Sequence, residues 1–327
     1  MVSLQKLLKQ IMTDYPKVSV VSITYGHEKY ITQTLDGVLM QHYPGEIEFI
    51  IANDNSPDNT DEVVKIYFSR KNIPTNFSIK YTKHEVNNGM MPNFVFALHQ
   101  TTGEYIALCE GDDYWNDSLK LQKQVDFLES HKHYSMCFHA TKTFDEFKKK
   151  FSFSDFLQKR DYKGGEILRT WTIPTASVLF RSKYLDQKVF ARLQNPKYIF
   201  GDIILFLSLE SKGKVFCLNE IMSVYRIHEA SALREFRTKF KLKTNQFINH
   251  HLSMSNDFDG KYRKINFMVI SDAYYRLILE EKGRFQKIKY LRKFNYYVFK
   301  GSKKTFFSIN HQKTIVYNFF SFLINPI

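Results

Sequence analysis

The chain has 327 residues, of which 43% are hydrophobic and 24% are charged, a composition typical of a folded globular protein and not of a disordered one. Its three cysteines, Cys109, Cys137 and Cys217, form no CxxC pair and each lies in an apolar run, which predicts buried free thiols and a protein of the reducing cytoplasm. Residues 232–327 carry +13 of the total net charge of +14, so we expect a near-neutral body followed by a basic region.

The first 140 residues alternate between strand and helix patterns. Short apolar runs predict four strands, at 18–23, 47–52, 77–82 and 104–110. Apolar residues at helical spacing predict four helices, at 30–41, 61–70, 93–100 and 118–131. Asp117 or Ser118 is placed to cap the last of these helices. The alternating order predicts an α/β fold, with a mostly parallel sheet covered by helices on both faces.

The pattern is looser after residue 140. Residues 175–182 predict a strand, and residues 202–213 predict a helix closed by Gly213. Residues 214–228 predict two strands joined by a turn at Asn219-Glu220. We therefore predict one domain over residues 1–231 and a helical, basic C-terminal region over residues 232–327.

The C-terminal region mixes its charges with aromatic residues, as in "KGRFQKIKYLRKFNYYVFKGSKKTFF". Such a segment is typical of a surface that meets an anionic membrane, and it is equally typical of a solvated helical face packed on the body by its aromatic residues. We do not expect nucleic acid as a partner. Near the N-terminus, residues 1–17 have a helical pattern without the apolar core of a signal peptide.

Acidic residues follow two of the predicted strands. Asp54 comes directly after the second strand, and Glu110, Asp112 and Asp113 come directly after the fourth. Because the carboxyl ends of parallel strands meet at one edge of a sheet, we expect these carboxylates to converge there. Clustered carboxylates are suited to Mg²⁺ or Mn²⁺, and such an ion completes its shell with substrate phosphates and water. The pattern therefore points to a nucleotide diphosphate.

Several other motifs are absent from the sequence. There is no GxxxxGK[ST] loop, no GxGxxG after the first strand, no Cys/His pattern at zinc spacing and no GxSxG elbow. Because the loop after the first strand, "TYGHEKY", contains no glycine cradle, we expect phosphate to be bound by a metal ion and cationic side chains.

Several motifs, taken in order, resemble the family-two glycosyltransferases. They are "VSVVSITYGHEKYITQTLDGVLMQ", "IEFIIANDNSPDNTDEVV", "NNGM", "GEYIALCEGDDYWNDSLKLQKQVDFLE", "IPTASVLFR", "GDIILFLSLESKGKV" and "MSVYRIHEASA". The resemblance spans about residues 16–231 and is closest to a bacterial branch with the "CEGDDYW" run. It implies the GT-A fold, with a nucleotide-binding half at about 16–140 and an acceptor-side half at about 141–231.

The resemblance also implies roles for individual residues in donor binding. Thr24, Tyr25 and Glu28 match positions that line the nucleotide pocket. Asp54 matches an acid that contacts the base of the nucleotide, whereas Asn53 departs from the acid usual beside it. The DxD motif of the family aligns with Glu110-Gly111-Asp112. This implies a metal role for Asp112 and Asp113 and a weaker one for Glu110.

A second group of residues matches positions nearer the reaction. Asp202 matches the catalytic base, although Asp at this point is also a favoured helix N-cap. Arg226 and His228 match a segment near the diphosphate, where His228 is a metal or phosphate ligand in the family-based interpretation and a structural histidine in the other. Thr175 and Ser177 match the acceptor side but also suit the polar face of a strand. Trp115 suits an acceptor platform or simple packing.

These observations lead to one functional hypothesis with two alternatives. We expect an inverting glycosyltransferase that uses a nucleotide-diphosphate sugar, UDP-sugar favoured, with Mn²⁺ or Mg²⁺. Its acceptor is expected to be a glycan or lipid-linked hydroxyl in bacterial surface polysaccharide synthesis, at the inner face of the cell membrane. The alternatives are a sugar nucleotidyltransferase and a non-catalytic nucleotide-fold protein whose basic tail does the binding.

Overall fold

The structure, a computed structural model, divides into two compact units. Unit 1 comprises Met1–Gln194 and Phe200–Glu235, and unit 2 comprises Asn195–Ile199 and Phe236–Ile327. The sequence places the boundary after Ser231, four residues earlier. The structure describes residues 15–308 except 154–157, 172, 230, 232, 233, 235 and 237, and it also describes residue 311. The helical pattern predicted for residues 1–17 therefore lies almost entirely outside the described residues.

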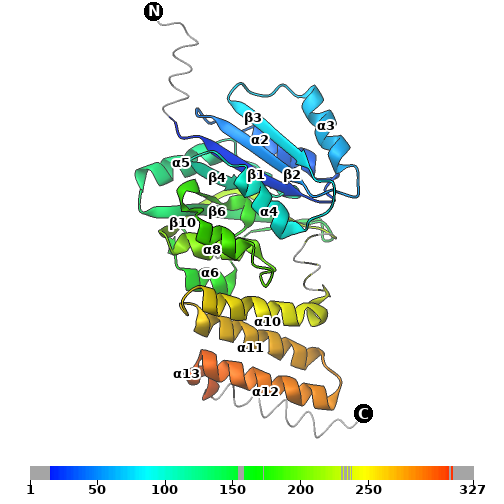
Figure 1. The fold of residues 1–327 in the computed structure, drawn as a ribbon, viewed down its shortest axis with the longest axis vertical. Helices are drawn as coiled ribbons and strands as arrows, with labels where there is room; N and C mark the ends of the chain where they lie inside the picture. Colours follow the sequence, from blue (N-terminus) through cyan, green and yellow to red (C-terminus); the bar gives the residue numbers. More distant parts are fainter. Residues whose placement is uncertain are drawn as a thin grey trace, which may run out of the picture. The chain divides into compact units, whose positions relative to one another are not determined.

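The N-terminal part of unit 1 follows the predicted alternation closely. Its strands are β1 (Val18–Thr24), β2 (Ile47–Asn53), β3 (Phe77–Lys83) and β4 (Tyr105–Leu108), and its helices are α2 (Ile31–Leu39), α3 (Thr60–Arg70) and α4 (Met90–His99). β1 lies between β2 and β4, and β3 lies beyond β2, all parallel (Figure 1). The carboxyl ends of β1, β2 and β4 therefore meet at one edge of the sheet.

The rest of unit 1 extends this sheet. The elements in order are β5 (Tyr114–Trp115), α5 (Lys120–Ser130), β6 (Tyr134–Asp145), β7 (Lys150–Phe153), β8 (Asp161–Tyr162), α6 (Gly164–Thr170), η1 (Thr175–Ser177), β9 (Leu179–Arg181), η2 (Ser182–Tyr184), α7 (Gln187–Leu193), α8 (Gly201–Glu210) and β10 (Lys214–Ile227). The strand order is β3-β2-β1-β4-β9-β6-β10-β5, with β7 on β6 and β8 on β10. β9 is antiparallel to both of its neighbours, so the sheet is mixed but mostly parallel in its first half.

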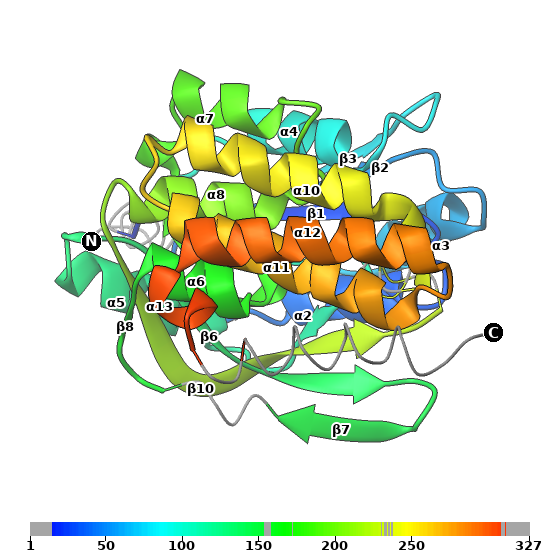
Figure 2. The same cartoon turned by 90° about the horizontal axis from the view of Figure 1, so that it is seen from below.

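The alternating side chains of the strands explain why helices cover both faces. Val20, Phe49 and Ala107 belong to a core cluster that also contains Leu35 of α2 and Leu121 of α5. The intervening side chains, such as those of Val21, Ile50 and Ile106, are also buried, on the face where α4 lies. Figure 2 shows α4 and α2 on opposite sides of the strands. Strands with both faces buried require near-continuous apolar runs, which is what the sequence contains.

Three predictions need correction or refinement, two in the acceptor-side half and one at the start of α5. Residues 214–228 do not form two strands, because β10 runs unbroken from Lys214 to Ile227 beside β6. Asn219 and Glu220 are exposed between register shifts of this ladder, so a bulge and not a turn absorbs them. The strand predicted at 175–182 begins with the 3-10 turn η1 and is strand only over β9. Asp117 accepts the N–H of Leu119 just before α5, so it orders the approach to the helix.

Unit 2 is helical, as predicted for the basic region. It contains α10 (Phe240–Asp257), α11 (Arg263–Glu280), α12 (Arg284–Gly301) and α13 (Lys303–Phe306). α11 and α12 pack through Ile278, Leu291, Phe294 and Val298, and α10 packs on α11 through Phe240 and Leu277. Among the described helices of the whole chain, none is both long and apolar enough to cross a bilayer. All three cysteines are buried and free, as predicted.

Candidate active site

The loop after β1 is fastened to the loop after β2. Three consecutive amides of the first loop donate to side chains of the second at 2.9–3.1 Å: Gly26 to Ser56 Oγ, His27 to Thr60 Oγ1 and Glu28 to Asp58 Oδ2. Glu28 Oε2 in turn accepts the N–H of Asn59 at 2.9 Å. These amides are therefore occupied, so they do not form a backbone nest for phosphate. Tyr25, whose side chain is 46% exposed, stays accessible on this loop.

Asp54 does not converge with the acids that follow β4. Its side chain is buried, and its two oxygens accept the N–H groups of Asn88 and Gly89, each at 2.8 Å. The carboxylate therefore orders the loop before α4. Each carboxylate oxygen can accept a further hydrogen bond, so the contact with a nucleotide base stays a prediction. Asp54 is not among the described residues whose ligand atoms lie close enough together to share one metal ion.

The three acids after β4 face different partners. Asp112 Oδ2 lies 3.0 Å from His228 Nε2 and 3.8 Å from His27 Nε2. Asp113 is fully buried, and its Oδ1 accepts the backbone N–H of Arg226 at 2.8 Å. Glu110 lies within electrostatic reach of Asp202, which begins the first turn of α8. Among the described residues, Asp112 is the one of these acids whose ligand atom lies close enough to others to share an ion. The other oxygen of Asp113, Oδ2, is buried without a hydrogen-bond partner in the described part of the chain, so metal roles for Asp113 and Glu110 stay predictions.

Asp112, His27 and His228 together form a candidate metal site. One ligand atom of each lies within 4.8 Å of the others. Donor atoms about 2.0–2.2 Å from one ion have comparable separations, so a carboxylate oxygen and two imidazole nitrogens fit a divalent cation. Burial alone would raise the pKa of Asp112, but the two histidines outweigh it and hold that pKa at about 2. Burial lowers the pKa of His27, which favours the neutral form that can bind a metal.

His27 was not among the residues singled out from the sequence. It is a single histidine with no metal-ligand spacing around it, so no local signal identifies it. Thr24, predicted to line the nucleotide pocket, instead orients His27, because its Oγ1 lies 3.1 Å from Nδ1 and leaves Nε2 directed at Asp112. Gly111 permits this arrangement, since a Cβ there would lie 2.6 Å from Thr24 Oγ1 and 2.9 Å from His27 Nδ1.

Asp202 is not the N-cap of α8. The N-cap residue is Phe200, and Asp202 lies in the first turn with its Oδ2 accepting the indole N–H of Trp171 at 3.2 Å. Burial raises the pKa of Asp202, and the bond from Trp171 partly opposes that rise. Burial also raises the pKa of Glu110 to about 8, with the charges of Asp112 and Asp202 adding to the effect. The site therefore contains two buried carboxyl groups whose pKa values are raised.

Two residues of β10 organise the site from the opposite side. The guanidinium group of Arg226 donates to the backbone oxygen of Asp112 and to Gln33 Oε1, so Arg226 fixes the acidic turn. Tyr225 was missed by sequence reasoning. Burial raises its pKa, and so do the charges of the surrounding acids, Asp113, Asp112, Glu110 and Asp202. The phenol of Tyr225 is therefore within electrostatic reach of all four carboxyl groups.

The residues predicted on the acceptor side are mostly buried. The Trp115 ring is 1% exposed, its indole N–H donates to Ala176 O at 2.9 Å, and Lys120 Nζ lies 3.9 Å from the ring centroid. Trp115 is therefore a packing residue and not an acceptor platform. Ser177 is likewise buried, with its hydroxyl donating to Pro174 O. Thr175 is the partly exposed member of the set and stays a prediction.

Comparison with known families decides the class of protein. The family described as Glycosyl transferase family 2 matches residues 19–190. The chain belongs to this family. This membership confirms the family that the sequence resemblance implied, and it favours a glycosyltransferase over the sugar nucleotidyltransferase and the non-catalytic protein.

Two curated relatives and one solved structure illustrate the similarity of this glycosyltransferase to others. An uncharacterized protein of Mycobacterium tuberculosis is 35% identical over 64% of this chain and 59% of its own length, so the chain spans less than two thirds of that relative. A putative teichuronic acid biosynthesis glycosyltransferase, TuaG of Bacillus subtilis, is 27% identical over 66% of this chain and 81% of its own length. A fragment of TarS of Staphylococcus aureus, residues 1–349 solved with UDP-GlcNAc, is 19% identical and matches with a TM-score of 0.58 over 86% of this chain and 81% of that fragment. This structural match shows the GT-A fold.

Proposed function

We propose that this family-two glycosyltransferase inverts the anomeric centre as it transfers a sugar from a UDP-sugar to a hydroxyl group of a glycan or lipid-linked acceptor in bacterial surface polysaccharide synthesis. The observation that carries the proposal is the cluster of Asp112, His27 and His228, with Glu110 of the same acidic turn within electrostatic reach of Asp202. The name of TuaG and the UDP-GlcNAc bound to TarS support the acceptor class and the donor.

The chemistry follows from the roles of these side chains. The acceptor oxygen attacks the anomeric carbon as the bond to the departing diphosphate breaks, and Asp202 accepts the proton of the acceptor hydroxyl. A bound Mn²⁺ or Mg²⁺ would take up charge on the departing diphosphate. Asp112, His228 and His27 would hold that ion. Tyr25, exposed on the first loop, is placed to contact the nucleotide base.

Calorimetric titration with UDP, with and without Mn²⁺, tests the donor and metal assignments together. We expect binding that requires Mn²⁺ and disappears in chelator. Asp112→Asn should lose this metal-dependent binding, whereas the adjacent Asp113→Asn should keep it, because Asp113 faces Arg226 and not the cluster. If both variants lost metal-dependent UDP binding equally, or if UDP binding were unchanged by chelator, the assignment of the metal site would be contradicted.

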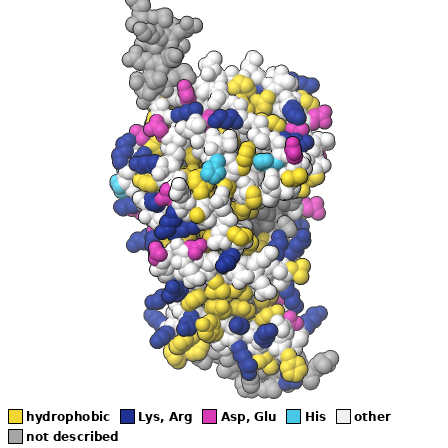
Figure 3. All heavy atoms as spheres, viewed as in Figure 1, with side chains coloured by type: hydrophobic (Ala, Val, Ile, Leu, Met, Phe, Trp, Pro, Cys, Tyr) yellow, Lys and Arg dark blue, Asp and Glu magenta, His cyan; other side chains and the backbone are white. Residues whose placement is uncertain are grey.

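We also propose that unit 2 attaches the enzyme to an anionic membrane surface. α12 contains six Lys and Arg residues and no Asp or Glu. It buries one stripe in the unit, yet its opposite stripe exposes four apolar or aromatic side chains, those of Phe285, Ile288, Tyr296 and Phe299. Figure 3 shows hydrophobic side chains with Lys and Arg around them over the helices of unit 2. A basic face with exposed rings is the pattern of helices that lie in the headgroup layer.

A further inference from the structure

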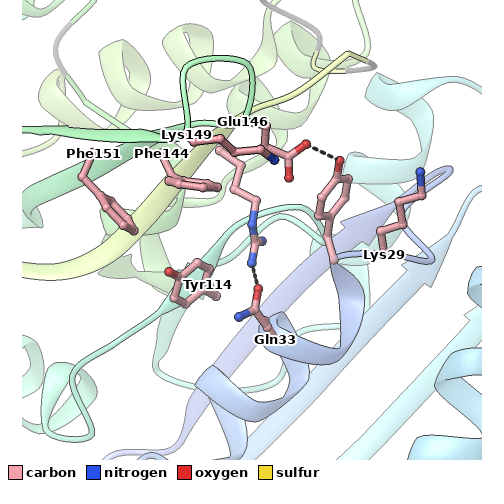
Figure 4. Close-up of a pocket in the computed structure, with 9 residues that line it drawn as sticks. Lys29, Gln33, Tyr114, Phe144, Glu146, Lys149 and Phe151 are labelled. Atoms are coloured by element: carbon pink, nitrogen blue, oxygen red, sulfur yellow. Dashed lines mark hydrogen bonds between the residues drawn. The ribbon is translucent and has the colours of Figure 1, made fainter.

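A pocket of about 560 Å³ lies beside the turn after β4, with Tyr114 and Arg226 in its lining. It is formed between the start of α2 and the hairpin of β6 and β7 (Figure 4). Arg226 and Tyr30 separate it from the metal cluster. Arg226 donates to Asp112 O, and the ring of Tyr30 packs against that of His228 with centroids 4.6 Å apart.

The walls of this pocket are aromatic. Phe144 and Phe151 are directly opposite each other in the β6–β7 ladder, with ring centroids 4.8 Å apart. The side chain of Phe151 is 52% exposed, so its ring is available to a ligand. Tyr114 lies across from them, as Figure 4 shows, with the Arg226 guanidinium 4.4 Å from its ring centroid. Aromatic walls with a few polar groups are typical of small-molecule sites, and the C–H faces of sugar rings pack on such walls.

The charges of the pocket favour an anion. Its cations are Lys29, Lys149 and Arg226, and its one acid is Glu146. Lys29 and Lys149 are exposed, and neither is paired with another described side chain. Glu146 already accepts the hydroxyl of Tyr30 at 2.9 Å, and burial and this bond raise the pKa of Tyr30 to about 12, so Tyr30 remains the donor. Two uncommitted ammonium groups therefore flank the aromatic walls.

We propose that this pocket binds an anionic saccharide, a sugar or polyol unit that carries a phosphodiester or a carboxylate, with its ring on Phe151 and Tyr114 and its charge between Lys29 and Lys149. Assignment of this ligand as part of the acceptor chain rests on the proposed transferase function, but the binding itself does not. The site is next to the metal cluster, so a chain held here has its neighbouring units close to the reacting end of the donor.

Binding of three probes to the full chain tests the proposal. The probes are a glycerol phosphate oligomer, an oligogalacturonate and neutral maltohexaose, each titrated calorimetrically at low and high salt. We expect one or both anionic oligomers to bind, with affinity that falls as salt rises, and maltohexaose not to bind at the same concentrations. The two anionic probes distinguish phosphate from carboxylate recognition. Equal binding of maltohexaose would overturn the proposal.

Variants of the hairpin locate the binding. We expect Lys149→Glu and Phe151→Ala each to weaken the binding of the anionic oligomer by about tenfold. The neighbouring Lys148→Glu makes the same charge change outside the pocket, so it should have at most a small effect on this binding. All three variants should bind UDP and Mn²⁺ as the parent does. Equal weakening by Lys148→Glu, or displacement of the oligomer by UDP with Mn²⁺, would sink the proposal. If the parent chain bound the oligomer but did not bind UDP, the transferase assignment alone would be contradicted.

Discussion

Neighbouring acids on the turn after β4 have different roles because they point in different directions. Asp112 lies beside two imidazoles, Asp113 accepts a backbone amide, and Glu110 is within electrostatic reach of Asp202. The same amino-acid type therefore titrates differently at adjacent positions. Burial raises the pKa of all three acids. It prevails at Glu110 and at Asp113, where the bond from Arg226 only opposes it, whereas the two histidines beside Asp112 lower the pKa of that carboxyl.

Asp202→Asn should reduce transfer by about 100-fold or more while leaving UDP binding unchanged, because the amide cannot accept the acceptor's proton. Since the base must be ionised, activity should fall as pH drops through the raised pKa of Asp202. Trp171→Phe removes the hydrogen bond that opposes this rise, so the acid limb of the rate profile should move to higher pH. A limb that stays in place or moves to lower pH would argue against Asp202 as base.

His27→Ala should weaken Mn²⁺ binding by about tenfold or more, since it removes one of the three donors. Thr24→Val should have a smaller effect of the same sign, because it frees the ring that Thr24 orients. Mn²⁺ titration followed by electron paramagnetic resonance measures this without substrate. His42→Ala is the control, as His42 is exposed and outside the cluster. Unchanged Mn²⁺ affinity in His27→Ala would remove His27 from the site.

At the scale of an element, α5 carries an unusual buried charge. Lys120, the first residue of the helix, is fully buried, with its ammonium group over the Trp115 ring and donating to Gln124 Oε1 at 2.7 Å. Burial lowers its pKa from 10.5 to about 7. Lys120 of this helix packs on Trp115, which follows the Asp112 turn. Burial of its ammonium group lowers the stability of the fold at neutral pH.

Lys120→Met should increase the free energy of unfolding at pH 7 by about 1 kcal/mol or more, because it keeps the apolar stem and removes the buried ammonium group. In the parent, the unfolded chain binds more protons than the folded chain between about pH 7 and 10.5, so stability should rise with pH across that window. The variant should lose this slope. Urea unfolding at several pH values measures both effects, with the half-exposed Lys123→Met as control; a destabilised Lys120→Met variant would contradict the assignment.

On the scale of the whole molecule, charge is divided between the two units. Unit 1 contains the acids of the site, and the sequence from residue 232 onward carries nearly all of the net positive charge. Under the proposed membrane attachment, a basic unit with exposed rings would concentrate the enzyme at an anionic surface, where a lipid-linked acceptor would be found.

Phe285→Ser should weaken binding to vesicles of phosphatidylglycerol and phosphatidylcholine by about tenfold, since burial of one aromatic side chain contributes roughly 1.5–3 kcal/mol. The Phe285 side chain is 89% exposed, so folding should be unaffected. Leu242→Ser on α10, where the side chain is 83% exposed, is the matched control. Sedimentation with vesicles measures the binding, and equal binding to pure phosphatidylcholine would contradict the electrostatic part of the proposal.

The sequence predicts local elements well and long-range pairings less well. The first four strands and their helices appear within a few residues of their predicted bounds because apolar runs and helical spacing are local signals. β6 was not predicted, because its pairing with β10 joins segments about 80 residues apart. β10 was predicted as two strands, because its two polar residues Asn219 and Glu220 resemble a turn but lie in a bulge of one strand. At the site, Asp112 and His228 come together as the resemblance implied. The geometry of the turns gives Asp112 and Asp113 different partners and brings His27 beside Asp112. Spacing along the sequence does not predict that geometry.

Tyr30 connects the metal cluster to the pocket lined by Phe144 and Phe151. Its ring packs on His228 and its hydroxyl donates to Glu146, so one rigid side chain contacts both the metal cluster and that pocket. A saccharide that displaces Glu146 changes the support of His228 and hence the metal affinity. Thermodynamic reciprocity then requires the metal to change saccharide affinity by the same factor. The enzyme would thus sense both ligands through a single coupling energy, measurable as the difference in oligomer affinity with and without Mn²⁺.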